Sequence, residues 1–135
     1  MGDLTANISR HELKCKCGKC DVRIQDHEQI IQVVQFVCDH FAEVYKVEKT
    51  QLEITSAARC YEYNRIPASE SGPGSNDESQ HPRCNAMDIK LYVYGQQIEP
   101  RRVADYLKAR YHFKYGIGEY NTFTHIDTRT KKARR

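Results

Sequence analysis

The sequence predicts an α+β domain with a small, mainly antiparallel sheet and flanking helices. A long amphipathic helix early in the chain and three later stretches of alternating apolar and polar residues predict this class. Their order, helix, strand, strand, helix and strand, lacks the regular alternation of a parallel α/β fold. At 135 residues, with 39% hydrophobic and 29% charged residues, the chain suits one domain with a modest core. No stretch approaches the roughly 18 apolar residues of a spanning helix, so we expect no membrane insertion.

The first predicted element follows a polar, turn-rich segment over residues 1–27. Asp26 is expected to cap a helix, with Glu28 and Gln29 in its first turn. Apolar side chains recur along this segment at helical spacing, so we expect the helix to pack on the core: Ile30, Ile31, Val34, Phe36, Val37, Phe41, Val44 and Tyr45.

Two strands are predicted next, separated by a loop. Leu52–Ser56 alternates apolar and polar residues, and 65–80 is rich in Pro, Ser and Gly. The second strand is predicted over Asn85–Tyr94. Its core face carries Met87, Ile89, Leu91 and Val93, so Asp88 is expected on the opposite face.

The last predicted elements are a helix, a turn and a strand. Pro100 suits the first turn of a helix that we expect to end near Arg110. Gly116–Gly118 indicates a turn, and the last strand is predicted over Phe123–Thr128. Alternation on that strand places Ile126 inward, with His125 and Asp127 together on the other face.

Basic residues gather at the end of the chain. The net charge is +3, and five of the last seven residues are Lys or Arg. We therefore predict a single domain over residues 1–128 and a basic C-terminal tail over 129–135. The tail is expected to be solvated, with a tether to an anionic polymer as the alternative. Because basic residues are not spread over a folded face, no specific nucleic-acid partner is expected.

Six cysteines are many for this length. Cys15, Cys17 and Cys20 form a cluster, which could bind a second zinc ion only with a fourth ligand. Cys38 and His40 are the candidates for that ligand. Without a visible secretory signal, free thiols in a reduced compartment are favoured over disulfides.

Three side chains could meet on the polar face of the predicted sheet. His81 lies where the loop enters the second strand, Asp88 lies on that strand, and His125 lies on the last strand. Two imidazoles and one carboxylate leave an open fourth position, as in catalytic zinc sites. Such a site activates water for attack at neutral pH.

The residues around these candidates resemble a known family. The stretch from Ser79 to Asp88 resembles the Ser-x-His-x-x-Gly-x-Ala-x-Asp motif of the zinc D-Ala-D-Ala carboxypeptidases, peptidase family M15. That family shares its fold with the hedgehog signalling domain. The stretch 123–129 is similar to the His-x-Asp ending of compact bacterial and phage members, and 55–59 resembles their Ser-Gly-Tyr-Arg segment. The likeness runs from about residue 7 to 129.

The resemblance implies a zinc peptidase that hydrolyses D-amino-acid-containing amide bonds in peptidoglycan stem peptides. It implies Zn²⁺ on the three candidate ligands, Arg59 on a substrate carboxylate or carbonyl, and Ser79 beside the metal. Asp127 is the favoured general base, with Glu119 as the alternative. Asp127 could instead form a surface ion pair with Arg129.

One departure from the motif opens alternatives. Cys84 replaces the motif's glycine, so a positive φ there would be strained. Its thiol could bind the metal or pair with Cys60. The second function considered is therefore a non-catalytic zinc module that binds a peptide or cell-wall fragment. A third is a small zinc-finger-like binder built on the cysteine cluster.

The start of the chain suggests where the protein is made. Residues 1–5 lack the basic and apolar regions of a secretory signal. We therefore expect synthesis in the cytoplasm and action on the cell wall after delivery by a lysis system or a phage particle. A monomer is expected.

Overall fold

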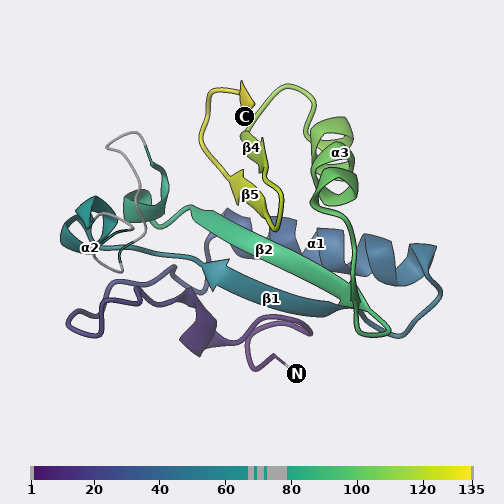
Figure 1. Cartoon of the computed structure of the whole chain (residues 1–135), viewed down its shortest axis with the longest axis horizontal. Coiled ribbons are helices and arrows are strands. Elements are labelled where there is room, and N and C mark those ends of the chain that lie inside the picture. The colour runs from purple at the N-terminus through teal and green to yellow at the C-terminus, as the bar shows by residue number, and fades with distance from the viewer. Residues whose placement is uncertain (1, 67–68, 70–71, 73–78, 135) are drawn as a thin grey trace.

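A six-stranded sheet organises the chain (Figure 1). The computed structural model describes residues 2–66, 69, 72 and 79–134, so the loop predicted over 65–80 lies mostly outside the described residues. The strands run in the order β1-β2-β5-β4-β6, with β3 also paired to β2. All pairs are antiparallel except β4 with β6, which confirms the predicted α+β class and mainly antiparallel sheet. The strands are β1 Gln51–Ser56, β2 Ala86–Val93, β3 Gln96–Gln97, β4 Gly116–Glu119, β5 Thr124–Asp127 and β6 Ala133–Arg134.

Two longer helices supply the core on one face of the sheet. They are α1 Gln29–Val44 and α3 Pro100–Arg110, the latter with the predicted bounds. The short α2 Tyr61–Arg65 follows β1, and 3-10 turns cover Arg10–Leu13 and His81–Arg83. Helix α1 begins three residues after Asp26, whose carboxylate instead pairs with Arg10 and Arg23 at 2.9 and 3.2 Å.

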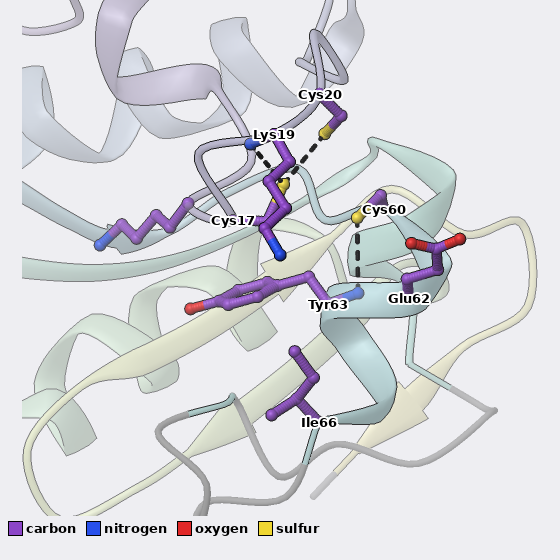
Figure 2. A pocket seen from close by; sticks show the side chains of 8 residues that line it. Cys17, Lys19, Cys20, Cys60, Glu62, Tyr63 and Ile66 are labelled. Carbon is purple, nitrogen blue, oxygen red and sulfur yellow. Dashed lines mark hydrogen bonds between the residues drawn. The ribbon is translucent and has the colours of Figure 1, made fainter.

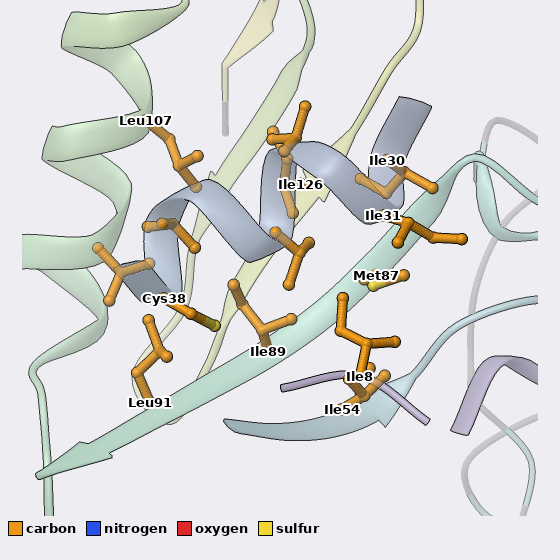
Figure 3. Close-up of a cluster of buried hydrophobic side chains, with 14 of the residues drawn as sticks. Ile8, Ile30, Ile31, Cys38, Ile54, Met87, Ile89, Leu91, Leu107 and Ile126 are labelled. Atoms are coloured by element: carbon orange, nitrogen blue, oxygen red, sulfur yellow. The ribbon is translucent and has the colours of Figure 1, made fainter. Parts of the chain in front are cut away.

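The core lies between α1 and the sheet (Figure 3). Met87, Ile89 and Leu91 of β2 are at most 1% exposed, as their alternation predicts. The N-terminal segment contributes as well, because its sparse apolar side chains, Ile8, Leu13 and Ile24, are completely buried. The sequence prediction of a merely polar, turn-rich start missed this contribution.

Strand register decides what the opposite face of the sheet carries. Met87 pairs with Ile126, and Ile126 with Ile117, so this apolar row faces the helices. One position further along β2, Asp88 pairs with Ser56 of β1 and with His125 of β5. Because side chains alternate along a strand, the aspartate and the histidine share the face away from the helices.

The C-terminal third differs from the prediction in two places. Gly116–Gly118 is part of strand β4 rather than a turn, and β5 is followed by one more strand, β6. The Arg134 guanidinium donates hydrogen bonds to the carbonyls of Tyr115 and Tyr111 at 2.8 and 3.0 Å. This part of the predicted solvated tail therefore packs on the domain. None of the helices in the described residues has the length and apolar character needed to cross a membrane.

Candidate metal centre

Three buried side chains converge on the face of the sheet opposite the helices. Asp88 Oδ1 lies 3.2 Å from His81 Nε2 and 2.9 Å from His125 Nδ1. Ligand atoms from all three residues lie within 4.8 Å of one another, close enough to hold one metal ion. The structure thus brings together the three residues that the sequence singled out as ligands.

The backbone explains how residues distant in sequence meet here. The 3-10 turn His81–Arg83 ends at Cys84, whose φ of 59° and ψ of 30° turn the chain into β2. Asp88 follows on β2, and the pairing of β2 with β5 places His125 directly opposite it. The site therefore depends on one tight turn and one strand register.

Each imidazole is held through the nitrogen that faces away from the site. His81 Nδ1 donates to the Ala57 carbonyl at 2.5 Å, and His125 Nε2 donates to Asp127 Oδ2 at 2.7 Å. Such outer contacts fix the ring orientation and leave the other nitrogen's lone pair for a metal. Burial lowers the pKa of His125, but hydrogen bonds that its ring donates to Asp127 and Asp88 outweigh burial and raise the pKa above the ordinary value.

Asp127 is completely buried and held from several sides. Arg129 Nε donates to Asp127 Oδ1 at 2.7 Å, and Arg129 Nη2 donates to Oδ2 at 2.8 Å. The Gly116 amide also donates to Oδ1, at 3.1 Å. Burial raises the pKa of Asp127, yet the bonds from His125 and Arg129 hold it below the ordinary value. A Cβ on Gly116 would lie 2.3 Å from this carboxylate, so only glycine leaves room for it.

Arg59 holds the second oxygen of Asp88, the candidate carboxylate ligand. Its Nη2 lies 3.5 Å from Asp88 Oδ2, while Nε and Nη1 donate to Ser56 and Asn64 at 2.9 and 3.2 Å. Burial raises the pKa of Asp88, but hydrogen bonds from the two histidines hold it below the ordinary value. The aspartate therefore presents Oδ1 to the site as a carboxylate.

This donor set fits a zinc ion with an open coordination position, because it offers two imidazole nitrogens and one carboxylate oxygen. A family model described as Peptidase M15 matches residues 6–127. The chain belongs to the peptidase M15 family. Peptidases of this family are metal-dependent hydrolases, and the buried triad is the candidate metal group of this M15 domain. Neither a curated protein nor a solved structure shows a significant match to the chain.

The other residues predicted for the M15 site occupy different surroundings. Ser79 Oγ accepts the His81 amide hydrogen at 3.3 Å, so it lies beside a candidate ligand. Glu119 is exposed at the end of β4 and pairs with Thr124, whose hydroxyl donates to Pro100 on the helix side. Strand alternation thus directs Glu119 to the face opposite His125.

The cysteines depart from the predictions in two ways. Cys84 has the positive φ that the motif's glycine would tolerate, but it is not part of the metal group found among the described residues. Cys60, its predicted partner, instead lies with Cys15 at an Sγ–Sγ distance of 3.8 Å. The prediction of Cys38 or His40 as a fourth ligand is wrong, because Cys38 is buried in the core and His40 stacks on a tyrosine ring.

The described residues include four contributors to the M15 site that were not predicted from the sequence: Ser56, Ala57, Asn64 and Gly116. Ala57 acts through its backbone carbonyl, which leaves no side-chain signal. Gly116 has the composition of a turn, and its place opposite Asp127 follows only from the pairing of β4 with β5. The Arg129–Asp127 pair was considered as a surface contact, but the structure buries its carboxylate.

Proposed function

We propose that the chain is a zinc-dependent peptidase that hydrolyses D-amino-acid-containing amide bonds in peptidoglycan stem peptides, on a hedgehog/DD-peptidase-type fold. The observation that carries the proposal is the open set of ligand atoms on His81, Asp88 and His125. Three protein ligands with a free position are typical of catalytic zinc sites, whereas structural sites have four.

The metal and the protein contribute different parts of the chemistry. When bound, zinc supplies Lewis-acid activation of water and of the scissile carbonyl. The protein supplies the orientation, because the Ala57 carbonyl and the Asp127 carboxylate fix the two imidazole rings. Arg59 keeps Asp88 Oδ1 directed at the site by holding its other oxygen.

We assign Asp127 an orienting role. Its carboxylate contacts His125 Nε2, on the side of the ring away from the ligand nitrogen, and both of its oxygens also accept from Arg129. A general base must reach the attacking water within about 3 Å or through one water. These contacts favour orientation of His125 over the base role predicted from the sequence.

The surface next to the site suits an anionic peptide. A hollow of about 410 Å³ adjoins the turn that carries His81, and its lining includes Arg83, Arg129 and Lys131. Asn85 also lines it, and its Oδ1 is buried without a hydrogen-bond partner. Arg129 is already paired with Asp127, so we propose that Arg83 and Lys131 attract substrate carboxylates and that Asn85 accepts a substrate amide hydrogen. Arg59 and Ser79 are proposed to contact the substrate nearer the metal.

The test is digestion of isolated peptidoglycan, with released peptides identified by mass spectrometry. We expect cleavage by the wild-type protein, its loss with a chelator, and its recovery after zinc is restored. His81→Ala should abolish both cleavage and metal binding at this site. His112→Ala is the matched control, because His112 is an exposed histidine and should leave both intact.

Two results would contradict the proposal. Undiminished cleavage by His81→Ala would exclude the assigned ligands. Zinc binding at this site without any cleavage would instead support the non-catalytic module that binds a peptide or cell-wall fragment. In that case Cys84→Gly, which restores the motif's residue, would show whether the cysteine silences an enzyme.

A further inference from the structure

Four thiols from two distant segments meet at one end of the molecule. Cys15, Cys17 and Cys20 come from the N-terminal segment, and Cys60 precedes helix α2. One sulfur from each lies within 4.8 Å of all the others. Figure 2 shows Cys17, Cys20 and Cys60 around the pocket at this place. We call these four residues the thiol cluster.

The sulfurs lie at separations close to those of a tetrahedral metal site. Zinc–sulfur bonds of about 2.3 Å place the sulfurs of a tetrahedral site about 3.8 Å apart. Cys15 and Cys60 have this separation, 3.8 Å, and Cys17 and Cys20 are 3.3 Å apart. All four cysteines are free thiols, so none is occupied by a disulfide.

Backbone amides are directed at the sulfurs. The amide of Lys19 donates to Cys17 at 3.3 Å, that of Cys60 donates to Cys15 at 3.3 Å, and that of Tyr63 donates to Cys60 at 3.4 Å. Hydrogen bonds of this kind favour the thiolate, which is the form that binds metals. The side chains of Lys16 and Lys19 line the same pocket and add positive charge next to it.

We propose that the thiol cluster binds one zinc ion of structural type, separate from the His81 site. Four thiolates fill a tetrahedral coordination sphere and leave no position for water, as in structural zinc sites. Soft sulfur ligands also select zinc over magnesium or calcium.

The position of Cys60 gives this metal a role in the architecture. Cys60 follows Arg59 directly, and Asn64 of the adjoining helix binds the Arg59 guanidinium. A metal on the thiol cluster therefore ties the N-terminal segment to the part of the chain that holds Asp88 through Arg59. We expect its loss to loosen this connection without removing any ligand of the other site.

The test counts zinc per chain in protein purified under reducing conditions, and needs no activity. Wild type should bind two zinc ions. Cys17→Ser and His81→Ala should each bind one, and the double variant should bind none. Cys38→Ala is the matched control and should bind two, because Cys38 lies in the α1 core outside the cluster.

Cobalt substitution keeps the test valid if Cys17→Ser does not fold. Wild-type protein loaded with cobalt should show thiolate-to-cobalt charge-transfer absorption that His81→Ala retains. The proposal is overturned if wild type binds a single zinc that depends on His81 alone, or if the charge-transfer absorption is absent. Two disulfides in the unreduced protein would also overturn it. If the thiol cluster binds no zinc, the zinc ion that depends on His81 is still counted. Failure of this proposal is therefore distinguishable from failure of the proposed peptidase.

Discussion

Replacement of Asp127 by asparagine tests whether this residue orients His125 or acts as the general base. Both oxygens of the carboxylate accept hydrogen bonds, one from His125 Nε2 and Arg129 Nη2, the other from Arg129 Nε and the Gly116 amide. An amide must place its NH₂ group against donors at one of these positions. Asp127→Asn therefore creates an unavoidable donor–donor conflict in a site that is completely buried.

The size of the effect follows from these contacts. Removing one charge of a buried ion pair costs about 3–5 kcal/mol of stability. We therefore expect the free energy of unfolding of the metal-free variant to fall by about 3 kcal/mol. Loss of an outer contact to a histidine ligand typically weakens metal affinity about 10–100-fold. Asp127→Asn should therefore bind zinc at least about tenfold more weakly and recover much of its turnover at saturating zinc.

The assay is competition for zinc with a chromogenic chelator, combined with peptide release at saturating zinc. Asp105→Asn is the matched control, because it changes an exposed carboxylate on α3 and should alter neither quantity. Unchanged zinc affinity with a loss of about 10²–10⁴ in turnover at saturating zinc would refute the orienting role and restore Asp127 as the base.

Three further predictions concern Gly116, Cys84 and the pH dependence of the Asp127 contribution. Gly116→Ala should lower zinc affinity about tenfold by displacing the Asp127 carboxylate, and an unchanged affinity would show that the strand adjusts. Cys84→Gly should stabilise the fold by about 0.5–1 kcal/mol in denaturant titration, since the relief of strain at this positive φ exceeds the entropy that glycine adds to the unfolded chain. Cys84→Ala keeps the strain and should bring no gain in stability. In the folded protein the pKa of Asp127 lies below its ordinary value of 3.8. The ionised carboxylate therefore stabilises the fold above about pH 3.8, and this contribution is lost as the pH falls toward the pKa of the folded state. The stability difference between metal-free wild type and Asp127→Asn should therefore shrink below about pH 4, and a constant difference would contradict the pKa direction.

Alternation along two strands was enough to predict which face of the sheet carries Asp88 and His125. The apolar residues Met87, Ile89 and Ile126 had to point into the core, so Asp88 and His125 had to share the other face. Side chains alternate between the two faces of a strand, so fixing the apolar face also fixes the other one. The structure agrees with this prediction. The start of α3 was predictable from Pro100, which suits the first turn of a helix, and the fold class from the order of the elements.

Contacts that depend on tertiary structure could not be predicted this way. Gly116–Gly118 has the composition of a turn, but pairing with β5 makes it a strand whose glycine accommodates Asp127. Cys60 lies 45 residues from Cys15, so no local spacing indicated their contact. Cys38 is closer in sequence to Cys20 than Cys60 is, yet it lies on the apolar face of α1 and is buried in the core.

The central claim is that His81 Nε2, Asp88 Oδ1 and His125 Nδ1 hold the metal of an M15 peptidase. Anomalous diffraction at the zinc absorption edge from crystals grown with zinc tests it most directly. We expect an anomalous peak within bonding distance of these three atoms, with zinc–nitrogen distances of about 2.0–2.1 Å and Asp127 still hydrogen-bonded to His125 Nε2. A crystal with zinc elsewhere and no peak at these three atoms would contradict it.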